Sequence, residues 1–274
     1  MAFGTSLRFD ANLSILFTEL PLLDRPAAAA KAGFDAVELW WPWVDAPVPA
    51  PHQLDALRRA LEDAGTQLVG LNFYAGELPG PDKGAASVPA LSDAFRANVP
   101  VAAEFARRVG CGALNALYGN RVAGVPAEEQ DALALRNLAY AAEAAAAADA
   151  VLLVEALNRP EAPDYPLITS AEALAVVERI NAATGLGNAR FLLDVYHLAR
   201  TGEEDVAAVI SAHGADVGHV QIADHPGRGE PGTGTLDFAA LLGALERSGY
   251  TGRVGAEYKP STGATDTSFG WLTK

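Results

Sequence analysis

The chain has 274 residues, half of them hydrophobic, and it carries 20 Lys and Arg against 34 Asp and Glu. This apolar content excludes a disordered chain. The formal net charge of −14 disfavours nucleic acids and anionic membranes as partners. The single cysteine, Cys111, excludes an internal disulfide and a cysteine-based zinc cluster. No basic segment precedes the first apolar run, and no stretch has 18 uncharged apolar residues. We therefore expect a cytoplasmic protein that acts on a small molecule, and a homo-oligomer stays open.

Eight short apolar runs, rich in β-branched or aromatic residues, recur along the chain and predict strands. They are LRFDANL (7–13), AVELWW (36–41), QLVGLNFY (67–74), ALNALYG (113–119), AVLLVEAL (150–157), ARFLLDVYH (189–197), VGHVQIAD (217–224) and RVGAEYKP (253–260). Helical patterns lie between them, at 21–32, 51–64, 93–109, 127–149, 170–183, 203–213 and 237–248. Glycines suited to left-handed C-caps stand at Gly33, Gly65, Gly110 and Gly249, and N-caps are expected at Ser170 and Asp237.

Strands of continuous apolarity that alternate with helices indicate a parallel sheet covered on its outside. An open doubly wound sheet and a closed (β/α)8 barrel both fit, and eight units without a composition break favour the barrel, as a single domain over 1–274. The last segment, TDTSFGWLTK (265–274), is short, so the eighth unit is expected to end in a stub. The longest loops, 74–92 and 158–169, follow strands and are expected over the face where barrel enzymes perform chemistry.

Polar groups interrupt four of the apolar strands near their ends: Glu155, Asp194, Gln221 and Glu257. An unpaired buried carboxylate is costly, so each must find a partner. One alternative is pairing with Arg or Lys, or hydrogen bonding to loop amides. The other is convergence at the top of the barrel, where three carboxylates and an amide oxygen would form a hard oxygen site for one divalent cation, Mg²⁺ or Mn²⁺.

The motifs around these residues resemble the hydroxypyruvate isomerase family of the xylose isomerase-like barrels. They are VEALNRPE (154–161), LDVYH (193–197), GHVQIADHPGRGEPGTG (218–234) and GAEYKP (255–260), together with ANLSILFTELP (11–21) and KAGFDAVEL (31–39). The resemblance implies one divalent ion held by Glu155, Asp194, Gln221 and Glu257. It also implies that Glu155 and Glu257 serve as the acid/base pair.

Three features bear on which branch of the barrels the chain follows. Gln221 stands where the ketose 3-epimerase branch carries His, which favours the isomerase branch. The NRPE motif ending at Glu161 looks more like the epimerase branch, and Thr235 stands where the isomerase branch usually has Glu. The resemblance implies isomerisation of hydroxypyruvate to tartronate semialdehyde, or of a four-carbon 2-oxo-tetronate, through an enediolate. A ketose 3-epimerase of the tagatose/psicose type is the alternative. A third class is a non-catalytic barrel, or a lyase or endonuclease relative.

An anionic substrate approaching an acidic protein needs local positive charge. Arg228 and Lys259 are placed to supply it, although a loop salt bridge and a surface position are the alternatives. His197 and Glu161 are further candidates for substrate contact, against a structural histidine and a solvated loop residue. Trp40, Trp41 and Trp43 are candidates for the pocket wall or the core. The segment GRGEPG (227–232) matches GxGxxG only formally, because Pro231 interrupts it and no helix follows directly.

Overall fold

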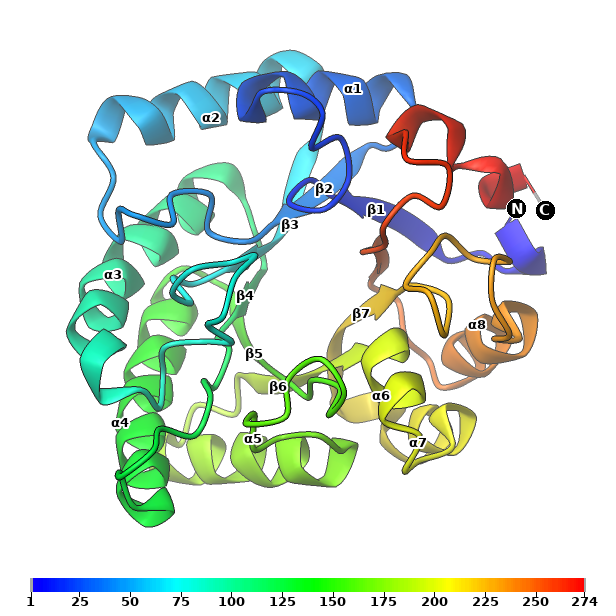
Figure 1. The fold of residues 1–274 in the computed structure, drawn as a ribbon. Helices are drawn as coiled ribbons and strands as arrows, with labels where there is room; N and C mark the ends of the chain where they lie inside the picture. Colours follow the sequence, from blue (N-terminus) through cyan, green and yellow to red (C-terminus); the bar gives the residue numbers. More distant parts are fainter. Residues whose placement is uncertain (1, 274) are drawn as a thin grey trace.

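The computed structural model describes residues 2–273, and its eight parallel strands close into a barrel in chain order (Figure 1). The strands are β1 (Arg8–Asn12), β2 (Ala36–Leu39), β3 (Gln67–Asn72), β4 (Ala113–Asn115), β5 (Val151–Glu155), β6 (Ala189–Asp194), β7 (Val217–Ile222) and β8 (Arg253–Ala256). Pairing of β1 with β8 closes the ring. The predicted (β/α)8 barrel is therefore confirmed. Its strands are shorter than the apolar runs from which they were predicted.

Helices surround the strands in Figure 1 and cover the barrel from outside. They are α1 (Arg25–Lys31), α2 (Pro51–Ala64), α3 (Ser92–Val109), α4 (Ala127–Ala147), α5 (Ser170–Thr184), α6 (Val195–Thr201), α7 (Val206–His213) and α8 (Phe238–Arg247). Short 3-10 turns lie at η1 (Ala2–Gly4), η2 (Leu22–Asp24), η3 (Pro89–Leu91), η4 (Gly214–Asp216), η5 (Thr265–Thr267) and η6 (Gly270–Thr273). No helix within residues 2–273 is long and apolar enough to cross a membrane.

Most predicted helix boundaries hold, and two predictions are wrong. All four predicted C-cap glycines have positive φ, and Asp237 caps α8 by accepting a hydrogen bond from the Ala240 amide. The N-cap of α5 is Thr169, one residue before the predicted Ser170, because Thr169 and Glu172 form a reciprocal capping box. The run expected as strand over 189–197 ends at Asp194, whose side chain caps α6.

The eighth unit ends in the expected stub. After β8 the chain forms only the turns η5 and η6, and no helix follows within the described residues. Trp271 of η6 is buried and packs against Phe3 of η1, with ring centroids 6.3 Å apart. The two ends of the described chain thus lie side by side, near α8, as Figure 1 shows.

The strands alternate between an outer and an inner layer of side chains, with the period of two that strand geometry imposes. On β5 and β6, Val154 and Leu193 belong to the large core between barrel and helices. Their neighbours Leu153 and Leu192 form a separate small apolar cluster with Ala113. Residues two positions further along, Glu155 and Asp194, therefore face the barrel interior at its carboxyl end.

Candidate active site

A pocket of about 730 Å³ opens at the carboxyl ends of the strands. Six predicted site residues are among those that line it: Glu155, Glu161, His197, Arg228, Glu257 and Lys259. The loop 74–92 contributes Leu78 and Lys83, and the loop 158–169 contributes Glu161 and Ala162, as expected for loops on this face. Asp194 and Gln221 are buried and are not among the lining residues; Asp194 contacts His197, which does line the pocket.

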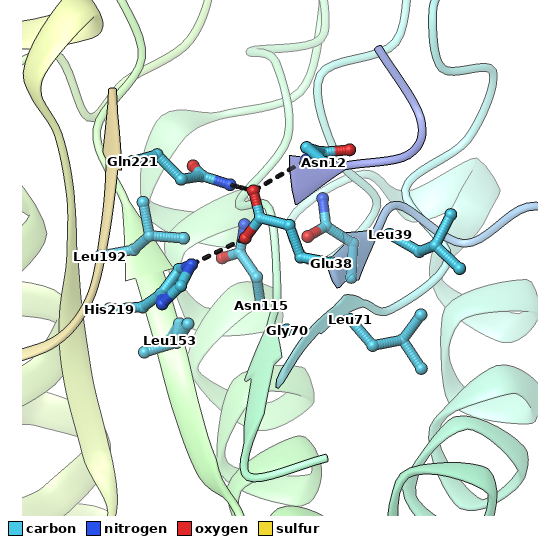
Figure 2. Close-up of a pocket in the computed structure, with 11 residues that line it drawn as sticks. Asn12, Glu38, Leu39, Gly70, Leu71, Asn115, Leu153, Leu192, His219 and Gln221 are labelled. Atoms are coloured by element: carbon cyan, nitrogen blue, oxygen red, sulfur yellow. Dashed lines mark hydrogen bonds and ion pairs between the residues drawn. The ribbon is translucent and has the colours of Figure 1, made fainter. Parts of the chain in front are cut away.

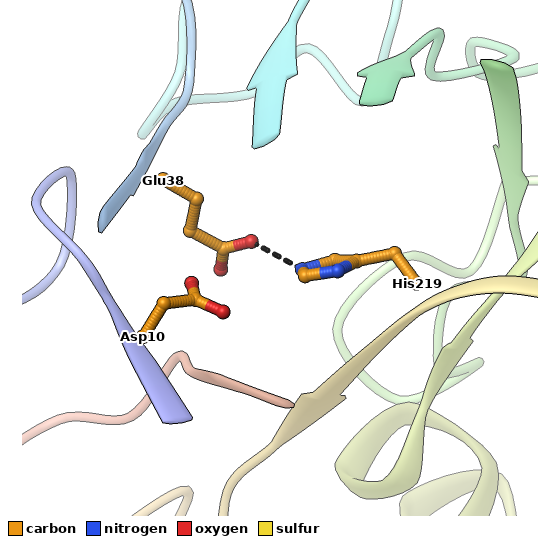
Figure 3. A group of neighbouring side chains, drawn as sticks. All are labelled: Asp10, Glu38 and His219. Carbon is orange, nitrogen blue, oxygen red and sulfur yellow. Dashed lines mark hydrogen bonds and ion pairs between the residues drawn. The ribbon is translucent and has the colours of Figure 1, made fainter. Parts of the chain in front are cut away.

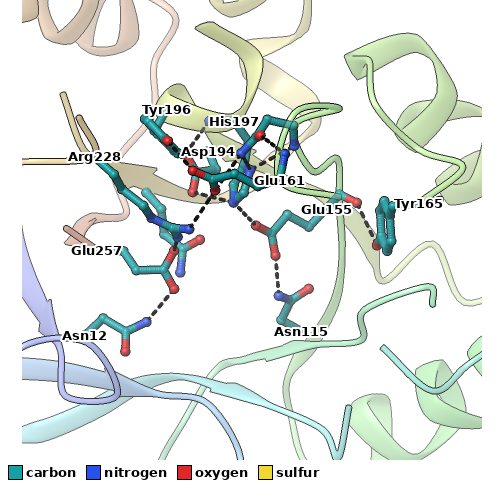
Figure 4. Close-up of polar contacts among 12 residues, drawn as sticks. Asn12, Asn115, Glu155, Glu161, Tyr165, Asp194, Tyr196, His197, Arg228 and Glu257 are labelled. Carbon is teal, nitrogen blue, oxygen red and sulfur yellow. Dashed lines mark hydrogen bonds and ion pairs between the residues drawn. The ribbon is translucent and has the colours of Figure 1, made fainter. Parts of the chain in front are cut away.

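Glu155 and Asp194 end neighbouring strands and present oxygen atoms to the same space (Figure 4). One oxygen of each is fixed by the protein: Glu155 Oε2 accepts from Asn115 Nδ2 at 2.8 Å, and Asp194 Oδ1 accepts from the His197 amide at 3.0 Å. Burial, and then the charges of Glu257 and Asp194, raise the pKa of Glu155 well above its ordinary value. Burial also raises the pKa of Asp194 to about 6, although Arg228 opposes the rise. The two carboxyl groups are buried close together, so a cation bound between them would favour their ionised forms.

His197 completes a group of three close ligand-type side chains with Glu155 and Asp194. Its Nε2 atom lies 3.9 Å from Glu155 Oε1 and 3.7 Å from Asp194 Oδ2, beyond hydrogen-bond distance. Its Nδ1 atom accepts from the backbone amide of Asn158 at 2.9 Å. A neutral imidazole that accepts at Nδ1 carries its proton on Nε2, and burial, then Arg228, hold the pKa of His197 well below its ordinary value. In this tautomer His197 donates toward the site and is not a cation ligand.

Glu257 follows β8 and is held on three sides. Its Oε2 atom accepts from Arg228 Nη2 at 2.7 Å, and its Oε1 atom accepts from Asn12 Nδ2 at 2.9 Å and from Trp40 Nε1 at 2.7 Å. Burial raises the pKa of Glu257 to about 7 although Arg228 lowers it. The sequence offered two alternatives for such a carboxylate: pairing with an arginine, or convergence with the other carboxylates. Glu257 pairs directly with Arg228, and it lies outside the close group of Glu155, Asp194 and His197.

Gln221 lies beside Asp194 in the β6–β7 register. Its Nε2 atom donates to Glu38 Oε1 at 2.9 Å. Its Oε1 atom is buried and has no hydrogen-bond partner among residues 2–273. A buried amide oxygen without a partner, on the residue opposite one of two close carboxylates, fits a hard divalent cation, because such ions take oxygen ligands. The donor set thus fits Mg²⁺ or Mn²⁺ better than a metal that prefers sulfur or several imidazoles.

The remaining predicted residues lie around the pocket mouth. Glu161 accepts from Tyr196 Oη at 2.6 Å and from Asn158 Nδ2 at 3.0 Å, and it lies 3.7 Å from Arg228 Nη1. Arg228 also lies over the Tyr196 ring, with its guanidinium carbon 5.2 Å from the centroid. Lys259 is exposed at the rim. Glu161 therefore holds Arg228 and Tyr196 in place as well as facing the pocket.

Several polar residues at the site were absent from the sequence prediction. Asn12 and Asn115 end β1 and β4 and hold the two glutamates, and Asn158 fixes His197. Trp40, a candidate for the pocket wall, lines the pocket, while Trp41 is buried and donates to the Ala46 carbonyl. Thr235 is not among the residues that line the pocket, and its hydroxyl bonds to the His225 carbonyl.

Comparison with known proteins places the chain in a family. Residues 26–274 match the family model described as xylose isomerase-like TIM barrel. A Streptomyces coelicolor protein named "Putative hydroxypyruvate isomerase" is 64% identical over 97% of this chain and 95% of its own length. The chain belongs to the hydroxypyruvate isomerase family. It is an enzyme of a family whose relatives are named as isomerases, so the predicted resemblance is confirmed.

Other relatives bear different names within the same barrel group. The Escherichia coli hydroxypyruvate isomerase is 34% identical over 97% of this chain and 98% of its own. The Cupriavidus necator 2-oxo-tetronate isomerase is also 34% identical, over 97% of each chain. A crystal structure from Brucella melitensis, named as an AP endonuclease of family 2, superposes with a TM-score of 0.86 at 32% identity, covering 97% of this chain and 98% of that one. A Methylomonas D-allulose 3-epimerase shares the fold, with a TM-score of 0.73 at 22% identity over 100% of this chain and 92% of that one.

Proposed function

We propose that this enzyme is a divalent-cation-dependent isomerase that converts hydroxypyruvate to tartronate semialdehyde, or acts on the four-carbon 2-oxo-tetronate homologue. The observation that carries the proposal is the buried Oε1 atom of Gln221, which has no hydrogen-bond partner among residues 2–273 and belongs to the residue opposite Asp194 in the β6–β7 register. Asp194 in turn lies close to Glu155. The names of the relatives support the same substrates. The cationic side chains around the pocket suit a carboxylate-bearing substrate.

Glu155, Asp194, Gln221 and Glu257 are the residues that would hold the cation. When bound there, Mg²⁺ or Mn²⁺ supplies Lewis-acid polarisation of the substrate carbonyl. The protein holds the oxygen atoms that would bind the cation in fixed positions through hydrogen bonds. Asn115 fixes Glu155, the α6 amide of His197 fixes Asp194, and Asn12 with Trp40 fixes Glu257.

Glu155 and Glu257 both line the pocket and are the proposed acid/base pair. One carboxylate removes a proton from C3 of hydroxypyruvate, and the electrons of the C–H bond form the C2=C3 double bond of an enediolate. A glutamate then returns a proton to C2, while the hydroxyl proton of C3 passes to the oxygen on C2. The product has an aldehyde at C3 and a hydroxyl at C2, so atoms and electrons balance. Burial raises the pKa of both glutamates toward the range useful for such transfers.

Arg228 is the proposed anchor for the substrate carboxylate, assisted by Lys259 at the rim. The guanidinium is already oriented by Glu257, Glu161 and the Tyr196 ring. Its Nε atom is buried and has no hydrogen-bond partner among residues 2–273. His197, with its proton on Nε2, is the proposed donor to a substrate oxygen.

A substrate panel tests the proposal. The metal-stripped protein, resupplied with Mg²⁺ or Mn²⁺, is assayed on hydroxypyruvate, 2-oxotetronates, fructose and tagatose. We expect kcat/KM to be highest on the 2-oxo acids. A preference for the ketohexoses would replace the proposal with the 3-epimerase alternative, which the position of Glu161 in the pocket would then explain.

Substrate charge gives a second prediction. Arg228→Met is expected to lower kcat/KM for hydroxypyruvate by about 100-fold or more, because a buried charge partner of the carboxylate is lost. A neutral ketose would share the lost Arg228–Glu257 contact and lose one hydroxyl contact, but no carboxylate partner, so its kcat/KM should fall far less. Arg159→Met is the matched control, since Arg159 pairs with Glu203 in an exposed position and is not among the residues that line the pocket. Equal losses on hydroxypyruvate and tagatose would contradict the role of Arg228 as a carboxylate anchor.

A further inference from the structure

A second polar cluster lies inside the barrel, next to the candidate active site. Glu38 of β2 is buried and extends into the barrel interior, where His219 Nε2 lies 2.7 Å from Glu38 Oε2. Figure 3 shows this pair with Asp10 of β1 beside it. Both Asp10 oxygens are buried without a hydrogen-bond partner among residues 2–273. The pocket lining does not include Asp10, Glu38 or His219, so the substrate chemistry proposed above leaves this cluster unexplained.

The barrel makes room for Glu38 with two glycines. A Cβ atom at Gly255 would lie 2.7 Å from Glu38 Oε1, and one at Gly70 would lie 3.2 Å from Glu38 Oε2. Gly255 stands directly opposite Gln221 in the β7–β8 register. Side chains at either glycine would displace the carboxylate from its position. The space around Glu38 is therefore shaped for a carboxylate that reaches across the interior.

Every hydrogen-bond contact of the Glu38 carboxylate is to a donor group. Besides His219, Glu38 Oε1 accepts from Gln221 Nε2 at 2.9 Å and from Asn12 Nδ2 at 3.0 Å, as Figure 2 shows. A carboxylate only accepts, so the two amides must turn their NH₂ groups toward it. The Gln221 carbonyl oxygen then has to point away from Glu38, and it is the atom that would bind the proposed cation.

Asn12 extends the effect to a second proposed ligand. Its Nδ2 atom donates to Glu38 Oε1 and also to Glu257 Oε1 at 2.9 Å. Its Oδ1 atom accepts from the Ser14 amide at 2.9 Å, which fixes the amide the same way round. The buried Glu38 carboxylate thus orients the Gln221 amide directly, and it orients Glu257 through the Asn12 amide that contacts both carboxylates.

We propose that Glu38 is a positioning residue for the cation site, acting through the Gln221 amide and, by way of Asn12, through the Glu257 carboxylate. The inference rests on the proposed cation site and goes beyond it. His219 Nε2 lies 2.7 Å from Glu38 Oε2, so a protonated His219 balances the charge of Glu38. Partners that orient metal ligands in this way typically change metal affinity by about 10–100-fold when they are removed.

Two substitutions of Glu38 separate hydrogen bonding from charge. Glu38→Met removes the acceptor and the charge, and we expect it to weaken Mn²⁺ binding by about 10–100-fold. Glu38→Gln removes the same charge but retains one oxygen that can accept from both amides, with its NH₂ toward His219. We expect its Mn²⁺ dissociation constant to stay within about threefold of wild type. Affinity is measured by calorimetry on the metal-stripped full chain, without substrate.

The EPR spectrum of bound Mn²⁺ distinguishes positioning from general stability. We expect it to change in Glu38→Met and to match wild type in Glu38→Gln, whereas a purely structural role would lower the unfolding temperature and leave the spectrum unchanged. Asp10→Asn is the control, because it removes a neighbouring buried charge that contacts neither amide. Should Glu38→Met not fold, Asn12→Ala replaces it, and there we expect about tenfold weaker binding.

Three results would overturn the inference. Equal losses in Glu38→Gln and Glu38→Met would show that charge, and not the acceptor oxygen, matters. Wild-type affinity in Glu38→Met and Asn12→Ala would show that neither amide needs holding. Two Mn²⁺ ions per wild-type chain, one of them lost in Glu38→Gln and Asp10→Asn alike, would make Glu38 a ligand itself. Hydroxypyruvate turnover is measured separately, so a wrong substrate leaves this test intact.

Discussion

Glu155→Gln and Glu257→Gln are each expected to lower turnover of hydroxypyruvate by about 10²–10⁴-fold, the usual contribution of a positioned acid or base. Glutamine keeps the size of each side chain and an oxygen for hydrogen bonding. Asn115 can therefore still donate to residue 155, and Asn12 and Trp40 to residue 257. What glutamine cannot do is take up and release a proton at the substrate carbon. Steady-state kinetics at saturating Mn²⁺ measure the loss.

Isotope exchange then separates the two roles. In D₂O, the variant that retains the base for C3 still exchanges deuterium into hydroxypyruvate, although turnover is lost. The variant that lacks this base exchanges no faster than a reaction without enzyme. Glu62→Gln, an exposed position on α2, is the matched control and is expected to behave like wild type. Wild-type turnover in either active-site variant would remove that glutamate from the mechanism.

The barrel could be predicted from the sequence because its strands carry an unambiguous signal. Strands such as Val151–Glu155 are buried on both sides, so they appear as short, nearly continuous apolar runs between helical patterns. A polar residue within such a run is buried on whichever side it faces, so it needs a polar partner or a bound cation. The period of two then turns Glu155, Asp194 and Gln221 toward the interior near the ends of their strands, and the β6–β7 register pairs Asp194 with Gln221.

The error at α6 has a local cause. Val195, Tyr196 and His197 extend an apolar run and favour a strand by composition. The Asp194 side chain accepts from the His197 amide and starts a helix instead, and the αL residue Gly202 ends it. A residue expected to coordinate a cation thus also serves as an N-cap. Composition alone does not distinguish these uses of an aspartate.

Glu38 carries the same sequence signal as Glu155, a carboxylate inside an apolar strand. It stands in an equally apolar run, AVELWW, and Asn12 and Asn115 interrupt β1 and β4 in the same way. These partners lie on β1, β2 and β4, away from the four strands whose polar groups were predicted to converge. The Arg228–Glu257 pair was different, because it joins a loop residue at φ 56° to a strand end 29 residues away. No local pattern encodes such a contact.

Removal of divalent cations is expected to lower turnover by about 10³-fold or more, the effect of losing several kcal/mol of stabilisation of the charge that develops on the substrate carbonyl. The protein is dialysed against EDTA and then into chelator-free buffer, and metal analysis verifies the stripping. Mg²⁺ or Mn²⁺ should restore turnover. Full turnover of verified metal-free protein would overturn the cation site.

The same ion should stabilise the fold, which gives a readout independent of catalysis. A ligand that binds only the native state raises the unfolding temperature in proportion to the logarithm of its excess over the dissociation constant. We expect Mn²⁺ to raise the unfolding temperature of the wild type, and not that of Asp194→Asn. Burial first, and then the neighbouring carboxylates, raise the pKa of Glu155 and of Glu257, so without an ion Glu155, Asp194 and Glu257 oppose one another's ionisation. Asp194→Asn relieves part of this repulsion, so the variant should unfold at a higher temperature than the stripped wild type while failing to respond to Mn²⁺. A catalytic defect caused by misfolding would move the unfolding temperature in the opposite direction.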